Sequence, residues 1–123
     1  MNKLLFRIAA LSGALSVMLG AFAAHGLKKL VTPEMVAAFE TGVRYQFYHT
    51  FVLLILALLS EKLPAGKLRW AAGCFITGIL LFSGSLYTLT ALQAIHTVGL
   101  TGIGILTPVG GLFFIAGWLV LMI

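Results

Sequence analysis

The chain has 123 residues, of which 61% are hydrophobic and only 9% are charged. Soluble domains carry about a quarter charged residues, so this composition excludes an ordinary water-soluble fold. The formal net charge is +5, but the basic residues are scattered between apolar blocks. A nucleic-acid-binding surface needs them clustered on one face, so we interpret them as charges that flank membrane-spanning segments.

Four apolar blocks divide the chain. Because one helical crossing needs roughly 20 apolar residues, each block is read as one transmembrane helix. The blocks run from about Leu4 to Ala24, Phe47 to Ser60, Trp70 to Leu92 and Leu100 to Ile123. The sequence therefore predicts an all-α membrane protein, with a single domain over residues 1–123 and four transmembrane helices.

The first block also has features of a secretory signal. Lys3 and Arg7 precede an apolar stretch that ends in Ala21-Phe22-Ala23-Ala24, which imitates an A-x-A cleavage site. We expect an uncleaved first helix, with a cleaved signal as the alternative.

A helix start lies between the first two blocks. Thr32 is a hydroxyl cap, Pro33 suits the first helical position and Glu34 suits the positive end of the helix dipole. Apolar residues then recur at helical spacing, namely Met35 or Val36, Phe39, Val43 and Phe47. This pattern predicts an amphipathic helix along the membrane surface, which bends at Gly42 and continues into the second crossing.

Charge and turn signals set the predicted topology. Alternate sides of the four crossings receive five and three Lys or Arg residues, with Lys3, Arg7, Lys62, Lys67 and Arg69 on one side and Lys28, Lys29 and Arg44 on the other. This excess favours both termini in the cytoplasm. The turn at Leu63-Pro64-Ala65-Gly66 predicts that helices two and three form a tight antiparallel pair.

Small residues mark the faces on which helices approach closely. The candidates for helix packing are Ser12, Ser16, Gly20, Gly73, Gly78, Gly84, Gly110, Gly111 and Gly117. In lipid, helices associate through such packing. Two interpretations remain open: contacts within one chain, and self-association.

A polar cluster is predicted around two histidines. His25 follows the first crossing and His49 opens the second, so the four-helix topology predicts that both lie near one interface. Tyr45 and Gln46 precede His49 by four and three residues and share roughly its helical face. The cluster either forms a proton relay or a ligand site, or makes polar contacts that hold the helices together at the interface. Two histidines without a nearby carboxylate or thiolate are too few ligands for a typical metal site.

The third and fourth blocks carry further candidates. Ser83, Ser85 and Tyr87 belong to a stretch rich in hydroxyls, which predicts helix adhesion or, alternatively, a polar path for a solute. Thr107-Pro108, followed by Gly110-Gly111, predicts a kink or break in the fourth helix. Such a break also occurs at some transport sites.

Several signals of catalysis are missing from the sequence. There is no GxSxG, HExxH, CxxC, P-loop or complete dinucleotide fingerprint. The three acidic residues, Glu34, Glu40 and Glu61, all fall near predicted interfaces, which weighs against an ordinary ion-coupled carrier. Cys74 is the only cysteine and offers no metal pair.

Four motifs, in order, carry a family resemblance. They are GAFAAHGL at 20–27, TGVRYQFYH at 41–49, LFSGSLY at 81–87, and TPVGG at 107–111 with Phe114 and Gly117-Trp118. They resemble the small bacterial membrane proteins of domain-of-unknown-function family 423, which includes human transmembrane protein 256. The resemblance implies a four-crossing protein of the bacterial cytoplasmic membrane without an established activity. The candidate site residues that fall in these motifs are His25, Gln46, His49, Ser83, Ser85, Tyr87 and Thr107.

The leading functional hypothesis is a non-enzymatic membrane protein that works by helix packing, as a homo-oligomer or as an accessory to a larger membrane complex. Its predicted partners are the lipid bilayer and other membrane helices, with no nucleic acid, and no cofactor is predicted. One alternative is a solute or ion pathway lined by the hydroxyls of the third helix and His25/His49. Another is a metal- or cofactor-binding membrane protein.

Overall fold

The computed structural model describes residues 1–96 and 101–123, and every regular element within those two ranges is helical. The elements are α1 (Lys3–Ala24), η1 (Leu27–Lys29), α2 (Pro33–Leu58), α3 (Ala65–Gly78), η2 (Ile79–Ser83), α4 (Gly84–Ala94), η3 (Thr101–Ile105) and α5 (Leu106–Met122). The all-helical fold predicted from the sequence is confirmed.

Helix α1 matches the first apolar block and is fixed at its start by Asn2. The Asn2 side chain accepts a hydrogen bond from the Leu5 amide at 3.0 Å, which satisfies one of the unpaired donors of the first turn. The Asn2 amide also donates to the Ala57 carbonyl at 3.0 Å. The start of α1 is therefore tied to the end of α2.

Helix α2 begins at the predicted cap, but it includes the segment expected to lie on the membrane surface. Thr32 accepts from the Met35 amide, and the helix runs without interruption through Gly42 to Leu58. The apolar residues Val36, Phe39 and Val43 are buried and cluster with Ala23 and Leu27. The separate interfacial helix is not confirmed, because its apolar face packs on protein.

The third apolar block forms one long helical rod, α3–η2–α4. In the middle, residues Ile79–Ser83 form a turn of π-helix, which is wider than an α-turn and holds about one extra residue. The rod ends at Ala94, and His96 follows with a φ of 56°. A left-handed residue just beyond a helix is a common C-terminal cap.

Helix α5 corrects the predicted break at Thr107-Pro108 and Gly110-Gly111, because it runs unbroken from Leu106 to Met122. Pro108 lies in its first turn, where amide groups have no partner within the helix. The change from 3₁₀ to α geometry comes earlier, after Ile105. Leu100, the expected start of this block, lies outside the described residues.

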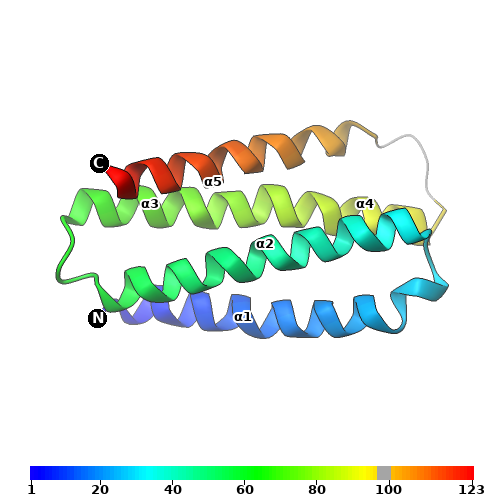
Figure 1. Cartoon of the computed structure of the whole chain (residues 1–123), viewed down its shortest axis with the longest axis horizontal. Coiled ribbons are helices and arrows are strands. Elements are labelled where there is room, and N and C mark those ends of the chain that lie inside the picture. Colours follow the sequence, from blue (N-terminus) through cyan, green and yellow to red (C-terminus); the bar gives the residue numbers. More distant parts are fainter. Residues whose placement is uncertain (97–100) are drawn as a thin grey trace.

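The helices form an open array. From one edge to the other, the order is α1, α2, the α3–η2–α4 rod and α5, with neighbours antiparallel, and both chain ends lie at the same end of the array (Figure 1). Among the described residues, the α1 backbone makes no close approach to α3, α4 or α5. The order therefore leaves α1 and α5 as edge helices.

Three helical segments in the described part of the chain are long and apolar enough to cross a membrane. They are Lys3–Ala24, Ala65–Ala94 and Gly102–Met122. Helix α2 is not among them, since polar residues such as Arg44, Gln46 and His49 interrupt its apolar sequence. The prediction of four crossings is thus met in part, by three candidate spans.

Candidate functional site

Helices α1 and α2 are joined by hydrogen bonds between short polar side chains. The hydroxyls of Ser12 and Thr50 lie 2.7 Å apart, and the Gln46 amide nitrogen donates to the Ser12 carbonyl at 3.0 Å and to its hydroxyl at 3.3 Å. Small residues allow this approach: a Cβ added at Gly13 would lie 3.5 Å from Thr50. Ser16 is 1% exposed and donates to the Ser12 carbonyl.

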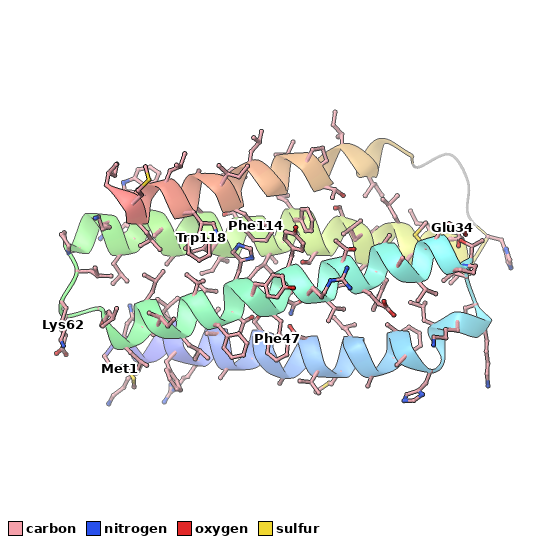
Figure 2. The ribbon with its side chains drawn as sticks, viewed as in Figure 1. Met1, Glu34, Phe47, Lys62, Phe114 and Trp118 are labelled. Atoms are coloured by element: carbon pink, nitrogen blue, oxygen red, sulfur yellow. The ribbon has the colours of Figure 1, made fainter. Side chains whose placement is uncertain are left out.

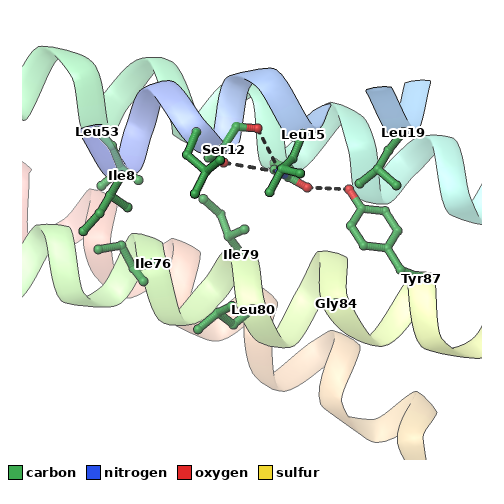
Figure 3. Close-up of a pocket in the computed structure, with 12 residues that line it drawn as sticks. Ile8, Ser12, Leu15, Leu19, Leu53, Ile76, Ile79, Leu80, Gly84 and Tyr87 are labelled. Atoms are coloured by element: carbon green, nitrogen blue, oxygen red, sulfur yellow. Dashed lines mark hydrogen bonds between the residues drawn. The ribbon is translucent and has the colours of Figure 1, made fainter. Parts of the chain in front are cut away.

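The same group of residues extends to the α3–η2–α4 rod, which we call the third rod. The Tyr87 hydroxyl of α4 donates to Gln46 Oε1 at 2.6 Å, so Gln46 links α1, α2 and α4 through one side chain. We call Ser12, Gln46, Thr50 and Tyr87 the polar seam. Figure 3 shows the chain of hydrogen bonds from Ser12 to Tyr87. Both amide hydrogens of Gln46 and the Tyr87 proton are used within the seam, so it presents no spare donor from these two groups.

His49 is held by a second set of contacts, which joins α2 to α5. Its Nδ1 lies 2.7 Å from the Tyr45 carbonyl, and Trp118 Nε1 donates to its Nε2 at 3.2 Å. A carbonyl only accepts and an indole only donates, so the imidazole is the neutral tautomer with its proton on Nδ1. The ring stacks on Phe114 with centroids 3.7 Å apart. Figure 2 labels Phe114 and Trp118 on α5.

The two histidines lie at different levels of the array, although the sequence predicted both near one interface. His25 is exposed and caps the end of α1, beside the start of α2. His49 lies far along α2 from Pro33, about 24 Å at a rise of roughly 1.5 Å per residue. The prediction assumed that α2 enters the membrane near Phe47. The helix starts at Pro33, so His49 belongs to its middle and not to its entry.

The hydroxyls of the third rod make contacts between helices. Ser83 donates to the Gly42 carbonyl of α2 at 2.6 Å, and the Ser85 hydroxyl pairs with that of Thr107 on α5. In the described residues, every fully buried side-chain nitrogen or oxygen has a hydrogen-bond partner. These hydroxyls hold neighbouring helices to one another, and Thr107 serves as the partner of Ser85.

Three of the nine predicted packing residues lie at very close contacts between the third rod and α5. A Cβ added at Gly110 would lie 2.3 Å from the Phe82 backbone nitrogen. Added at Gly78 or Gly117, it would lie 2.4 Å from the ring of Phe114 or 2.7 Å from that of Phe75. Only glycine fits at these positions without movement of a neighbour.

The other predicted glycines have more room. An added Cβ would meet Val43 at 3.5 Å from Gly20 and Phe82 at 3.8 Å from Gly111, which are ordinary contacts. At Gly73 and Gly84 it would meet nothing within 4 Å among the described residues. These two positions are therefore open on the surface of the third rod.

Two members of these contacts were not among the predicted site residues. Thr50 also donates to the Gln46 carbonyl at 2.8 Å, and its place four residues after Gln46 is a signal that could have identified it. Trp118 was noticed only as part of a motif. Its role as a donor to His49 depends on side-chain contact between α2 and α5, for which sequence spacing has no signal. In the described residues, no three side chains of His, Cys, Asp or Glu come together as a metal-binding group.

The apolar helices and the mutually bonded polar side chains define a small, all-helical integral membrane protein. The chain belongs to the family described as "Protein of unknown function (DUF423)", whose model matches residues 19–121. It is 39% identical to the UPF0382 membrane protein SH2409 of Staphylococcus haemolyticus, over 98% of this chain and 93% of the relative.

Two further relatives span similar lengths. The UPF0382 membrane protein YwdK of Bacillus subtilis is 36% identical, over 98% of this chain and 94% of its own. The UPF0382 membrane protein C1782.12c of Schizosaccharomyces pombe is 37% identical, over 97% and 98%. No solved structure matches the chain. The family resemblance noted in the sequence is confirmed, and it carries no assigned activity.

Proposed function

We propose that α2 is a fourth transmembrane helix. A segment of α2 from Phe39 to Ala57 runs alongside α1. At one end the rings of Phe22 and Phe39 have centroids 6.2 Å apart, and at the other the Asn2 amide donates to the Ala57 carbonyl. This part of α2 is about 27 Å long at ~1.5 Å per residue, close to the roughly 30 Å of a bilayer core. Its lipid-facing residues then include Phe51 and Ile55, which are more than half exposed.

Arg44 is compatible with this crossing. It is exposed, and its guanidinium donates to Thr41, one turn nearer the start of α2. Arg44 lies only about 8 Å inside Phe39 along the helix, so its long side chain reaches the membrane surface by snorkelling.

With four crossings, both termini lie on one side, and the excess of Lys and Arg assigns that side to the cytoplasm of a bacterial inner membrane. Labelling of single cysteines in a Cys74→Ser background tests this topology. Lys62→Cys is expected to react with a membrane-impermeant maleimide only after the cytoplasmic side is opened. Lys28→Cys should react in intact spheroplasts, and the same accessibility for both positions would contradict four crossings.

The function that we propose is non-enzymatic: the protein associates with other membrane helices, as a homo-oligomer or within a larger complex. The observation that supports it is the open array, in which, among the described residues, the α1 backbone approaches only α2 and η1, and the α5 backbone approaches only the third rod and η3. Leu112 on α5 is 66% exposed, and Met18 on α1 is 63% exposed. In lipid, such edges associate by close packing. In the part of the chain that the structure describes, the fully buried polar side-chain atoms all have hydrogen-bond partners, which suits a role in holding the helices together.

Cross-linking in native membranes tests association directly. In the Cys74→Ser background, Met18→Cys and Leu112→Cys place one thiol on each edge helix, and Lys62→Cys places one in an exposed loop as a collision control. We expect at least one edge position to form a discrete disulfide-linked dimer, or a stable adduct with one partner, above the loop control. Purification in mild detergent should give a defined oligomer or a stoichiometric partner. A partnerless monomer, with cross-linking no greater than the loop control, would contradict the proposal.

A further inference from the structure

A groove runs between α1 and the third rod, where the two backbones do not touch. It has a volume of about 370 Å³, and Leu15 and Leu80 are among the apolar residues that line it. Its polar lining is Ser12, Gln46 and Tyr87 of the polar seam (Figure 3). Because the donors of Gln46 and Tyr87 are already used, a ligand carbonyl would find none there. The groove therefore suits a hydrocarbon better than a polar solute.

The groove reaches the end of the array at which both termini lie. A second cavity of about 440 Å³ shares two lining residues, Ile8 and Ile76, with the first. These side chains extend from α1 and α3 toward one another (Figure 3). The second cavity is more polar, with Asn2, Ser60 and Arg69 in its wall. The two cavities adjoin at Ile8 and Ile76, and we call the apolar one the inner groove and the more polar one its mouth.

The mouth is positively charged. Among the described residues, no carboxylate lies within salt-bridge distance of Arg69, and Glu61 is paired with the Met1 ammonium at 2.9 Å. Ala65, the first residue of α3, also lines the mouth, and no side chain caps that helix. Uncapped amides and a guanidinium together favour an anion such as a phosphate.

We propose that this groove binds one anionic phospholipid, with its phosphate at Arg69 and one acyl chain along the apolar part. From Ile8 to Leu19, the inner groove follows α1 for about 16 Å, which matches one leaflet of a core roughly 30 Å thick. The length and the apolar lining of the groove are therefore suited to a single acyl chain. This site goes beyond the proposed association and does not depend on it.

Native mass spectrometry of the full-length protein in detergent tests the site. The probes are dioleoylphosphatidylglycerol, the zwitterionic dioleoylphosphatidylcholine and inorganic phosphate. We expect one phosphatidylglycerol per chain, bound roughly tenfold more tightly than phosphatidylcholine, because a charge-assisted Arg–phosphate contact favours the anion by about that factor. Arg69→Gln should remove this preference. Arg7→Gln is the matched control, because Arg7 lies toward the same end but does not line either cavity.

The acyl-chain part is tested by filling the groove. Gly84→Leu should weaken both phospholipids by roughly tenfold, because loss of apolar burial acts on the tail of either lipid. Ala10→Leu adds similar bulk at an exposed position outside the groove and should have no effect. Leu80→Trp, at a groove residue that is 68% exposed, repeats the test should Gly84→Leu fail to fold.

Three results would overturn the proposal. Equal losses for Arg69→Gln and Arg7→Gln would show general charge attraction. Unchanged lipid binding in both groove-filling variants would exclude the groove as the acyl-chain site. Competition by inorganic phosphate to completion would show an anion site that does not require a lipid. Since these measurements count lipid per chain, they are independent of whether the protein is a monomer or an oligomer.

Discussion

The third rod meets α5 in a very different way from that in which it faces α1. Toward α5, Gly78, Gly110 and Gly117 receive an aromatic ring or a backbone segment at distances that exclude any side chain. Toward α1, a Cβ added at Gly84 would meet none of the described residues within 4 Å, and a groove separates the helices. Both sides carry glycine in an apolar sequence. The difference teaches that a glycine brings this rod and a neighbouring helix together only where the neighbour places a ring or a backbone segment at the same level.

The largest predicted effect tests the closed side. Gly110→Ala would place a Cβ 2.3 Å from the Phe82 amide nitrogen and 2.8 Å from its Cα. Backbone atoms move less easily than a side chain, so we expect a loss of about 3 kcal/mol in unfolding free energy, at the upper end of overpacking. Denaturation in mixed micelles, followed by circular dichroism, measures it.

Gly73→Ala is the matched control on the open side. An added methyl group there meets nothing within 4 Å, so alanine should stabilise α3 by about 0.5–1 kcal/mol through its higher helix propensity. Similar effects of the two substitutions, with the same sign, would mean that the close approach of Gly110 to Phe82 does not govern stability.

The second prediction concerns the seam that holds α1 to the array. Gln46→Leu keeps most of the volume but removes the acceptor of Tyr87 and the donor to Ser12. We expect a loss of about 1–2 kcal/mol, because a Tyr87 hydroxyl left without its acceptor in an apolar setting is costly. Thr88→Val, which removes only an exposed bond within α4, should change little. Equal losses of unfolding free energy for Gln46→Leu and Thr88→Val in the same denaturation assay would mean that the hydrogen bonds of the polar seam do not stabilise the fold more than an exposed bond within one helix.

The smallest predicted effect lies in the loop between α2 and α3. The Met1 ammonium donates a hydrogen bond to Glu61 and attracts its charge, so the pKa of this carboxyl is below its ordinary value of 4.5. A lowered pKa contributes stability that is present above pH 4.5 and is lost as the pH falls through the lowered value. The side chain is 83% exposed, so solvent screens the pair. Glu61→Gln should lower the melting temperature slightly at neutral pH, with a difference that disappears in acid. A difference that grows in acid would contradict this assignment.

The helices were predictable because apolar block length and cap chemistry act locally. Thr32 and Pro33 mark the start of α2 for this reason. Whether the residues after Pro33 contact lipid or protein was not predictable, since an apolar face that includes Phe39 and Val43 packs equally well on lipid or on another helix. The side-by-side order of the helices determines that this face packs on α1 and η1.

The candidate site was predictable only in its components. Gln46, His49 and Tyr87 were recognised as polar groups in an apolar chain, but their partners are on other helices, 34, 69 and 41 residues away. Those pairings depend on the depth at which each helix sits. The expectation that His49 lies near the same interface as His25 had a similar origin, because it placed the membrane entry near Phe47 although the helix already starts at Pro33.

The π-turn at Ile79–Ser83 has a consequence for how this chain tolerates insertions and deletions. An ordinary α-helix turns about 100° per residue, so loss of one residue within α3 would rotate Phe75 and Gly78 away from α5. Loss of one residue within the wide turn would instead leave regular α-helix, with the faces before and after it still aligned. The rod therefore tolerates the loss of one residue at its centre, because the helix faces on both sides of the π-turn remain in register with their neighbours.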